Sequence, residues 1–520
     1  MKDEIQIKRA LVSVYDKKGV LELATMLKKF SVEILSTGGT AAYLQENGIP
    51  VTSVSDVTGF PEILGGRVKT LHPKIHGAIL AKRDDDSQMT ELQQHDIEPI
   101  DLVVINLYPF EKTVAKPDVS LSEALENIDI GGPTMIRAAA KNFPGVAVVT
   151  SPDQYKTVIS ELEATAGALT LATRQKLATE AFRLTSTYDL AITNYLSSLA
   201  EEEQGMPESL NIMLKKVQDL RYGENPHQQA AFYTDKTVYE NELGKKLHGK
   251  ELSFNNILDM NAAVGLVSEF KESCVVILKH NNPCGVAIDE DIVTAYRNAL
   301  ATDPVSAFGG IVAFNRQVNA KVAELMSKVF LEVILAPSFS DEALSLLTKK
   351  KNIRLVEIPR LSLDEKALDI KRVYAGYLLQ NMDLAAEPTE SYRVVTKRQP
   401  ETKDWQAMQF GWKVVKWVKS NAVIFVSDKM TLGIGAGQMS RVDSSKLAVM
   451  KAKDAGLSLE GSVVVSDAFF PFRDGIDAAA QAGAIGVIQP GGSIRDQEVI
   501  DAANEHGMFM VFTGIRHFRH

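Results

Sequence analysis

A lysine and a histidine, Lys279 and His280, stand next to each other where a buried strand is expected to end. The expected strand is the apolar run at 274–278. The polar residues 281–283 should end it, because they include a proline, which lacks a backbone donor. Ligands of open α/β sheets bind at such strand ends. The pair is therefore a candidate ligand-binding pair; the alternative is two solvated side chains on a turn.

A loop of glycines and hydroxyl groups, residues 36–40, is expected between a strand at 32–35 and a helix at 41–47. Its glycines let the backbone approach a ligand closely, and the N-terminus of the helix favours an anion. The pattern predicts phosphate binding, although it is neither a P-loop nor a dinucleotide motif. The alternative is a plain turn in which Thr40 caps the helix.

Residues 65–77 begin with two glycines and carry Arg67 and Lys69, which would point the same way in an extended segment. We interpret this segment as a second binding loop, with solvated charges as the alternative. His72 and His76 have the spacing of a helical metal pair. The proline after His72 disfavours a helix there and the motif has no glutamate, so we predict no zinc site.

The third polar segment, residues 129–144, is expected to form a helix, with Pro133 in its first turn and Pro144 beyond its end. Arg137 and Lys141 lie four residues apart and would share one face of this helix. An anion between them would offset their repulsion. The repulsion by itself favours a neutral Lys141, a state that is useful for proton transfer. The alternative is that Lys141 only complements the C-terminus of the helix.

The first 200 residues alternate apolar strands with helical patterns, which predicts a parallel sheet with helices on both faces. A long helical pattern over 173–199 leads into a charged run, interrupted by Gly and Pro, at 201–207. We place the domain boundary there and predict domains at 1–199 and 200–520. The expected strands of the first domain are at 9–15, 32–35 and 102–107.

The second domain repeats one order of elements: a strand, a glycine segment, a helix and further strands. We predict two copies of one α/β unit, over about residues 274–337 and 422–490, with residues of both converging on one site. The glycines at 433–437 do not complete a GxGxxG dinucleotide-binding motif, because position 438 is a glutamine, so no nicotinamide cofactor is inferred. The basic tail at 514–520 is expected to fray.

The composition excludes several classes of protein. The chain has 57 Lys and Arg against 66 Asp and Glu, a net charge of −9, which argues against nucleic-acid binding. Its two cysteines, Cys274 and Cys284, exclude a disulfide scaffold and a four-cysteine zinc site. No N-terminal apolar signal region and no apolar run of about 18 residues is present, so we expect no membrane span and a cytoplasmic protein.

Together these segments resemble the bifunctional purine biosynthesis protein family, which joins an aminoimidazole-carboxamide ribonucleotide (AICAR) formyltransferase to an inosinate (IMP) cyclohydrolase. The resemblance implies a methylglyoxal-synthase-like parallel-sheet domain, the cyclohydrolase, at 1–199. It implies a duplicated cytidine-deaminase-like α/β domain, the formyltransferase, at 200–520. The segments that carry the resemblance are 65–72, 129–142, 221–228, 279–285, 433–441 and 467–474.

The implied chemistry is transfer of a formyl group from 10-formyltetrahydrofolate to AICAR, followed by ring closure with loss of water to give IMP. Deaminases of this fold hold zinc with several cysteines, whereas here no second cysteine follows Cys284, so no catalytic metal is expected. The resemblance also implies a homodimer with a shared formyltransferase site. Its ligands would be small nucleotides and folate, with no nucleic acid and no membrane.

For the formyltransferase, the resemblance implies that His280 is the base for the attacking amine and Lys279 its electrostatic or proton-shuttling partner. Asn421 is implied to orient the carboxamide. The other residues implied to bind the nucleotide are Arg221, Tyr222, Gly309, Glu332, Arg441 and Arg516. Those implied to contact the folate are Phe469, Asp474, Gly491 and Gly492.

For the cyclohydrolase, the resemblance implies that Lys141 is the leading acid or base, with Lys69, Asp129 and Tyr108 near it. The residues implied to bind the nucleotide and its phosphate are Ser13, Lys17, Thr37, Gly38, Gly39, Thr40, Arg67, Thr70 and Asn106. Two other hypotheses stay open. The N-terminal domain could be a regulatory nucleotide-binding module, or the enzyme could have one activity and a structural N-terminal half.

Overall fold

The computed structural model describes residues 3–199, 205–234, 243–359, 361–364, 367–384 and 389–520. The chain divides into two compact units, Met1–Met213 and Leu214–His520. The domain boundary predicted after residue 199 falls at residues 200–204, outside the described residues. Across the described ranges, no helix combines the length and the apolar character that a membrane span needs.

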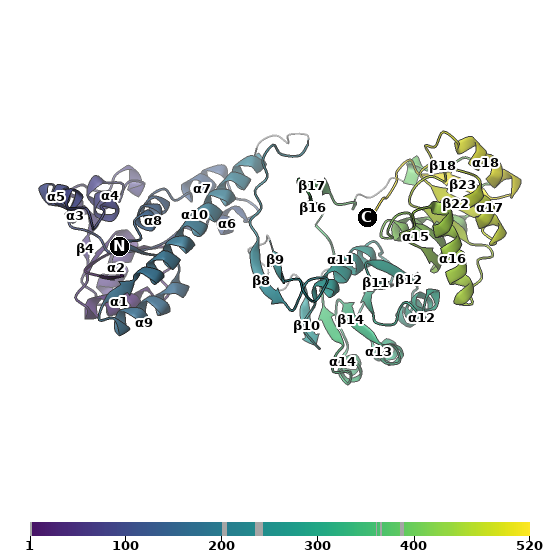
Figure 1. Cartoon of the computed structure of the whole chain (residues 1–520), viewed down its shortest axis with the longest axis horizontal. Coiled ribbons are helices and arrows are strands. Elements are labelled where there is room, and N and C mark those ends of the chain that lie inside the picture. Colours follow the sequence, from purple (N-terminus) through teal and green to yellow (C-terminus); the bar gives the residue numbers. More distant parts are fainter. Residues whose placement is uncertain (1–2, 200–204, 235–242, 360, 365–366, 385–388) are drawn as a thin grey trace. The chain divides into compact units, whose positions relative to one another are not determined.

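The first unit alternates strands and helices along most of its length (Figure 1). Its elements are β1 (Glu4–Gln6), β2 (Arg9–Val14), α1 (Val20–Lys29), β3 (Glu33–Ser36), α2 (Gly38–Glu46), β4 (Thr52–Ser53), α3 (Val54–Thr58), η1 (Leu64–Gly66), α4 (Pro73–Leu80), α5 (Asp86–Gln94), β5 (Leu102–Asn106), α6 (Phe110–Val114), α7 (Leu121–Glu126), α8 (Gly131–Lys141), β6 (Ala147–Val149), η2 (Pro152–Gln154), α9 (Tyr155–Ala164), β7 (Ala168–Thr170) and α10 (Leu171–Leu199).

The predicted parallel sheet of this unit is confirmed, with the strand order β4-β3-β2-β5-β6. Four apolar residues of β5, Leu102 to Ile105, are buried, as is typical of a parallel strand covered on both faces. One apolar core packs α1 and α9 on the sheet, and a second packs α4 and α8. The long helix α10 contributes to both cores.

The second unit contains two mixed sheets and two separate hairpins (Figure 1). Its elements are β8 (Lys215–Leu220), β9 (Ala230–Thr234), β10 (Lys245–His248), α11 (Phe254–Ser268), β11 (Cys274–Lys279), β12 (Asn282–Ile288), α12 (Ile292–Thr302), β13 (Gly310–Phe314), α13 (Ala320–Ser327), β14 (Leu331–Ala336), α14 (Asp341–Leu347), β15 (Arg354–Glu357), β16 (Leu368–Val373), β17 (Gly376–Asn381), η3 (Thr389–Ser391), β18 (Arg393–Val394), α15 (Thr402–Val415), β19 (Val423–Val426), β20 (Thr431–Gly435), α16 (Arg441–Asp454), β21 (Val463–Ser466), α17 (Asp474–Gln481), β22 (Gly486–Gln489), α18 (Asp496–Glu505) and β23 (Phe509–Phe512).

The predicted duplication is confirmed by the topology. The strand orders are β10-β15-β14-β13-β11-β12 and β18-β23-β22-β21-β19-β20, so each sheet has a hairpin at one edge and three parallel strands beside it. Helices α11 and α15 share one apolar core with strands of both sheets. The edge strands also join the repeats, because Ile288 N donates to Lys429 O at 2.8 Å and Val286 N donates to the Thr431 hydroxyl at 2.9 Å.

The turn at His280 differs from its prediction. The sequence placed residues 281–283 beyond the strand as a turn leading to a helix, but the chain returns at once as β12, with Pro283 inside the strand. Proline is tolerated there because β12 is an edge strand. Since β11 runs antiparallel to β13, Lys279 lies beside the amino ends of β13 and β14, so the rule for carboxyl ends of parallel strands does not apply.

The C-terminal tail also differs, because it is packed rather than frayed. His517 is only 3% exposed, and its Nδ1 lies 2.6 Å from a carboxylate oxygen of Asp383. Its backbone N–H donates to Asp467 O at 2.9 Å, and Ser420 N donates to Arg519 O at 2.9 Å. These contacts tie the tail to the loops that flank β19 and β21.

Candidate functional site

A cavity of about 730 Å³ lies in the first unit, where β2, β3 and β5 end. It is lined by every binding residue predicted for the cyclohydrolase and by all of its predicted catalytic residues except Lys141. The predicted residues that line it are Ser13, Lys17, Thr37, Gly38, Gly39, Thr40, Arg67, Lys69, Thr70, Asn106, Tyr108 and Asp129.

Two ammonium groups lie close to the first residues of α2, on the wall of this cavity. A β-carbon on Gly38 would lie 3.5 Å from Lys69 Nζ, and one on Gly39 would lie 3.9 Å from Lys17 Nζ. Gly38 also has a φ of +47°, which favours glycine. The free N–H groups of the helix N-terminus and two cations together suit a phosphate group.

The loop before α2 is not capped as the alternative hypothesis supposed. The N-cap is Thr37, whereas Thr40 lies inside the helix, where its hydroxyl accepts from Val14 N at 3.1 Å and donates to Val14 O at 3.0 Å. Thr40 therefore fastens α2 to the end of β2. The capping interpretation of Thr40 was wrong because a tertiary contact took its hydroxyl.

Asn106 shapes a second wall of the cavity. Its Oδ1 accepts from Tyr15 N at 2.6 Å and from Asp16 N at 3.0 Å, and its Nδ2 donates to Asp16 O at 2.9 Å. The side-chain amide of Asn106 therefore makes its hydrogen bonds to the loop after β2. This loop presents Tyr15, whose ring centroid lies 5.2 Å from that of Tyr108. The two half-exposed rings offer an aromatic surface for a planar base.

Asp129 brings a buried carboxyl to the cavity. Its Oδ1 accepts from Gly132 N at 2.8 Å, at the start of α8. A β-carbon on Gly132 would collide with the other carboxylate oxygen, so this approach requires glycine. Burial raises the pKa of Asp129, and the hydrogen bonds from Gly132 and Gly131 offset part of the rise. A raised pKa suits a group that exchanges protons near neutral pH.

The prediction that Arg67 and Lys69 point the same way required an extended segment, but the segment is not extended. Residues 64–66 form a 3₁₀ turn and Arg67 has helical dihedral angles, yet both cations line the cavity. Arg67 pairs with Glu126, and Lys69 Nζ lies 3.2 Å from Glu62. Each of these carboxylates is partly exposed.

Lys141 occupies the exposed last position of α8, while Gly131 at the other end of the helix lines the cavity. The ten residue steps from Gly131 to Lys141 correspond to about 15 Å of helix. The structure therefore does not bring Lys141 to the residues that it was predicted to work with.

His72 has an extended backbone before Pro73, as predicted, and caps α4 by accepting from Lys74 N at 3.1 Å. Within the described ranges, no three His, Cys, Asp or Glu side chains gather as a metal site would require.

In the second unit, His280 and Asn281 form the two-residue turn between β11 and β12, with φ angles of 53° and 62°. Positive φ is uncommon for residues other than glycine and occurs at functional sites. The carboxylate of Asp259 on α11 accepts from Asn281 N at 2.7 Å and so holds the turn. Burial raises the pKa of Asp259, while the hydrogen bond from Asn281 and the charge of nearby His280 oppose this rise.

Lys279 and Gly309 lie together at the amino end of β13. The Lys279 ammonium donates to Phe308 O, and a β-carbon on Gly309 would lie 3.5 Å from it. Glu332, at the start of β14, accepts from Asn256 Nδ2 at 2.9 Å and lies 3.8 Å from Arg354. Since Asn256 and Asp259 both belong to α11, this helix connects Glu332 with the His280 turn.

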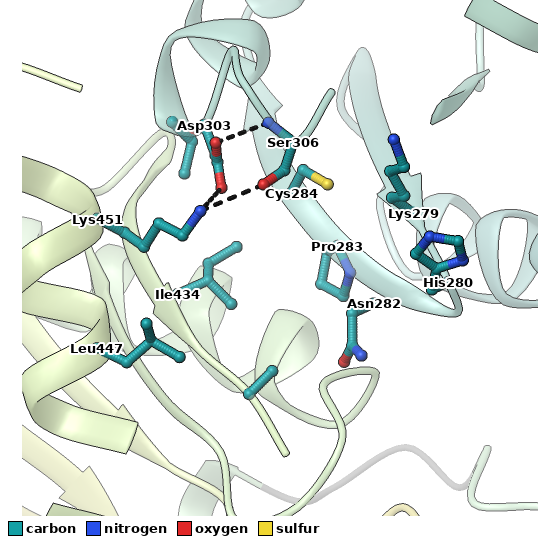
Figure 2. A pocket seen from close by; sticks show the side chains of 12 residues that line it. Lys279, His280, Asn282, Pro283, Cys284, Asp303, Ser306, Ile434, Leu447 and Lys451 are labelled. Atoms are coloured by element: carbon teal, nitrogen blue, oxygen red, sulfur yellow. Dashed lines mark hydrogen bonds and ion pairs between the residues drawn. The ribbon is translucent and has the colours of Figure 1, made fainter. Parts of the chain in front are cut away.

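Two cavities meet at His280. The smaller one, of about 240 Å³, contains Asp259 and also Lys419 of the second repeat. The other, of about 340 Å³, extends past Lys279 and Cys284 to Lys451, which pairs with Asp303 at 2.9 Å (Figure 2). Burial raises the pKa of the Cys284 thiol to about 12, so it is not a thiolate at neutral pH. Residues of both repeats thus line the space around His280, as predicted.

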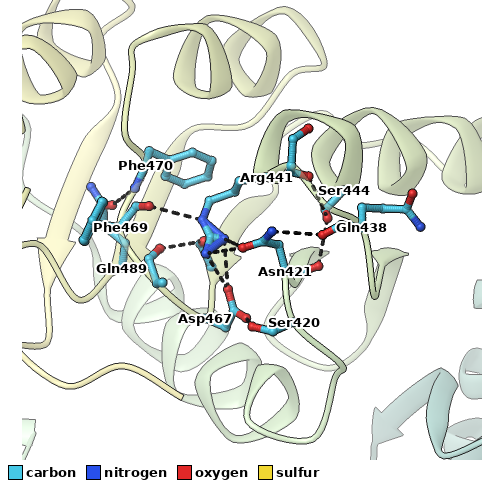
Figure 3. Close-up of polar contacts among 12 residues, drawn as sticks. Ser420, Asn421, Gln438, Arg441, Ser444, Asp467, Phe469, Phe470 and Gln489 are labelled. Carbon is cyan, nitrogen blue, oxygen red and sulfur yellow. Dashed lines mark hydrogen bonds and ion pairs between the residues drawn. The ribbon is translucent and has the colours of Figure 1, made fainter. Parts of the chain in front are cut away.

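Asn421 and Arg441 belong to a buried network in the second repeat (Figure 3). The guanidinium of Arg441 donates to Asn421 Oδ1 at 3.1 and 3.2 Å and pairs with Asp467 at 3.0 Å. The Asn421 Nδ2 donates to Gln438 O at 2.9 Å and Met439 O at 3.1 Å. The amide and guanidinium groups are thus used within the protein, and they fix the segment between β20 and α16.

The remaining predicted residues lie on loops. Arg221 stacks over Tyr222 at 5.5 Å after β8, and Arg516 stacks over Phe518 at 4.5 Å in the tail. Phe469 is 39% exposed, whereas its neighbour Phe470 is buried. Asp474 begins α17, and the pair after β22, Gly491 and Gly492, has φ angles of 71° and 92°.

Sequence reasoning missed two positioning groups, Asp259 and Tyr188. Each lies on a helix whose pattern was recognised, but neither was given a role. Their roles depend on contacts with Asn281 and Asp129, which are 22 and 59 residues away in sequence. For Asp259, the sequence did offer one signal: a carboxylate stands among apolar residues in a segment that was expected to form a helix.

Comparison with known proteins gives two family matches in succession. The chain matches the model described as AICARFT/IMPCHase bienzyme over residues 139–451 and the model of an MGS-like domain over residues 19–134. Among 19 matching solved chains is one titled "Crystal structure of ForH". It is 34% identical, and the match covers 38% of this chain and 100% of that chain, with a TM-score of 0.35.

Proposed function

The chain belongs to the AICARFT/IMPCHase bienzyme family, and from this premise we propose which residues carry out each of its reactions. The protein is a bifunctional AICAR formyltransferase and IMP cyclohydrolase of purine biosynthesis. Its family implies nucleotide substrates and formyl-tetrahydrofolate as the co-substrate.

Ring closure, in this proposal, takes place in the 730 Å³ cavity of the first unit. The phosphate of formyl-AICAR lies at the start of α2 between Lys17 and Lys69, and its base lies against the rings of Tyr15 and Tyr108. The carboxamide nitrogen attacks the formyl carbon and loses one proton to Asp129, while a lysine protonates the formyl oxygen, which becomes a hydroxyl group. The formamido nitrogen then loses its proton as the ring C=N bond forms, and the hydroxyl group takes up a second proton and leaves as water. Holding the carboxamide and the formyl group in the right orientation supplies much of the rate enhancement of ring closure, because both groups belong to one molecule.

The observation that carries this assignment is the convergence of all the predicted binding residues on one cavity. The geometry supports Lys69 as the proton donor, because its ammonium lies against Gly38 inside the cavity. The family resemblance supports Lys141, which lies at the exposed end of α8. Paired variants of these two lysines decide between them.

Formyl transfer takes place at His280. The histidine removes the proton of the AICAR amine as it attacks the formyl carbon, and Lys279 stabilises the oxyanion. The bond between the formyl carbon and N10 of the folate then breaks, N10 takes up the proton, and tetrahydrofolate leaves. Asn421 and Arg441 act by shaping the loop that faces the substrate, since their polar groups are engaged within the protein. The nucleotide is further held by Arg221, Tyr222, Gly309, Glu332 and Arg516, and the 10-formyl folate by Phe469, Asp474, Gly491 and Gly492.

The proposal also covers the organisation of the enzyme. Residues 1–199 form the cyclohydrolase and residues 200–520 the formyltransferase, which works as a homodimer that shares this site. The reaction needs no catalytic metal and takes place in the cytoplasm. Support for the metal-free chemistry comes from the sequence, in which no second cysteine follows Cys284.

The test is to supply purified protein with AICAR and 10-formyltetrahydrofolate and to follow IMP, with and without a chelator. Formyl-AICAR alone should give IMP as well. A double variant Lys69→Ala/Asp129→Ala should accumulate formyl-AICAR in the first reaction and fail in the second. If it closes the ring at the original rate, the first unit is a regulatory module and the assignment of the cavity is wrong.

A further inference from the structure

The segment that carries Asp129 is held by a tyrosine of another element. Tyr188 lies on α10, is 8% exposed and is not among the residues that line the cavity. Its hydroxyl accepts from the backbone N–H of Asp129 at 2.8 Å and donates to Asn127 O at 3.1 Å. One oxygen atom thus bridges two backbone groups on either side of residue 128.

The carboxylate of Asp129 is fixed separately, by the N–H of Gly132 at 2.8 Å. The side chain therefore has one anchor at the helix α8 and the backbone has another at Tyr188. Without the second anchor, the partly buried N–H of Asp129 and the carbonyl of Asn127 would both lose a partner, which costs free energy unless the segment moves. Movement of the segment would displace the carboxylate from its place in the cavity.

We propose that Tyr188 is a positioning residue for ring closure: its hydroxyl holds the Asn127–Asp129 backbone so that the Asp129 carboxylate faces the reacting carboxamide. The inference rests on the proposed assignment of ring closure to this cavity. Tyr188 acts through Asp129 and does not touch the substrate.

The chain offers a matched pair of variants for testing this inference. Tyr188 and Tyr195 both lie on α10, and both pack their rings edge-to-face on Phe110, with centroids 6.2 and 5.7 Å away. Among the described residues, the Tyr195 hydroxyl has no hydrogen-bond partner, whereas that of Tyr188 bridges the Asp129 segment. Tyr188→Phe and Tyr195→Phe each remove one oxygen and retain the ring.

Both variants are assayed for ring closure with formyl-AICAR and for formyl transfer on the same full-length protein. Tyr188→Phe should lower kcat for ring closure about tenfold, the effect of about 1.4 kcal/mol, with KM unchanged. Tyr195→Phe should keep both constants. Formyl transfer should be unchanged in both, and calorimetric titration with IMP should give the same stoichiometry as the parent protein.

A Tyr188→Phe protein with parental kcat would overturn the inference. So would a loss explained by reduced IMP stoichiometry or by a higher KM alone, because either result would mean that the hydroxyl only supports folding or binding. Asp129→Asn separates this inference from the proposal beneath it. If Asp129→Asn closes the ring normally, the cavity assignment fails and the role of Tyr188 fails with it. If Asp129→Asn is inactive and Tyr188→Phe is not impaired, only the role of Tyr188 fails.

Discussion

The two proposed active sites lie at opposite ends of parallel strands. In the first unit, the cavity opens where β2, β3 and β5 end, as the rule for open α/β sheets predicts. In the second unit, the His280 turn lies beside the amino ends of β13 and β14. The second repeat has the opposite arrangement to the first: Asn421 precedes β19, whose first residue, Val423, pairs with Ser466 at the carboxyl end of β21.

This difference shows what duplication makes possible. Asn282 of the first repeat accepts from Lys419 N of the second at 2.9 Å, so the amino edge of one sheet meets the carboxyl edge of the other. A single α/β unit offers only one polar edge of each kind. Two copies facing each other offer both kinds in one place, which suits a reaction that must hold a nucleotide and a folate together.

The two units share one structural feature despite this difference, an aspartate that holds a backbone N–H near the proposed reacting group. In each, a partly buried aspartate accepts a backbone N–H: Asp129 from Gly132 at the start of α8, and Asp259 from Asn281 in the turn after β11. Burial raises the pKa of both carboxyls. The proposed roles differ, because Asp129 reacts with the substrate whereas Asp259 holds the turn that carries the reacting histidine.

The largest effect should come from the second site. His280→Ala should lower formyl transfer by about 10²–10⁴-fold, the usual contribution of a general base, and leave ring closure unchanged. Both rates are measured on one preparation with AICAR or formyl-AICAR as substrate. His506→Ala, in the same unit but paired with Asp477, is the control and should keep both activities. Full formyl transfer in His280→Ala would remove it as the base.

The next effect tests the first site. Lys69→Met should lower ring closure about 100-fold, because the cavity loses both an acid and a phosphate-facing cation. Lys141→Met should change it less than about threefold if position along α8 decides the role. Steady-state kinetics with formyl-AICAR measures both. The opposite ranking would support the family resemblance over the geometry, and would require the end of α8 to approach the substrate.

A smaller effect should follow from changing the aspartate behind the His280 turn. Asp259→Asn keeps an oxygen that accepts from Asn281 but removes the charge near His280. We expect formyl transfer to fall about tenfold, because the charge beside the reacting groups is lost. Steady-state kinetics with AICAR measures this. An unchanged kcat would mean that Asp259 acts only through the hydrogen bond.

The smallest effect concerns stability. The raised pKa of Asp129 means that its ionised form is disfavoured in the folded state, so the wild type loses stability as pH rises above 3.8 and through the folded pKa. Asp129→Asn should therefore unfold at a slightly higher temperature at pH 7, by about 2–4 °C at most, and show no gain below pH 3.8. Calorimetric scans at the two pH values test this. A variant less stable at pH 7 would mean that the carboxylate is held more favourably than its burial indicates.

Much of the fold was predictable because buried strands are short apolar runs. The strands expected at 9–15, 32–35 and 102–107 correspond to β2, β3 and β5, and the repeated order of elements proved to be a repeated topology. The direction of β12 was missed because proline at an edge strand is indistinguishable, in sequence, from proline in a turn. The packed tail was missed because its contacts with Asp383 and Asp467 are distant in sequence.

The cavity of the first unit was likewise predictable, since its polar segments follow successive strands of one parallel sheet. The placement of Lys141 was not. Spacing along a helix tells which residues share a face. The cavity, however, lies at the N-terminal end of α8. That end faces the cavity because of how α8 packs against β5 and β6, which spacing does not reveal. The buried aspartate and tyrosine that hold the turns were hidden for a similar reason, because each acts on a residue of another element.

The packed tail has a consequence for how fusions to the protein should be designed. Residues 517 and 519 hold the backbone of Asp467 and Ser420, on two loops that border the Arg441 network. His517 is only 3% exposed, so a tag placed against it would displace these contacts. Removing residues 514–520 should therefore loosen both loops and lower formyl transfer, while the proposed ring-closing cavity of the first unit keeps its lining residues.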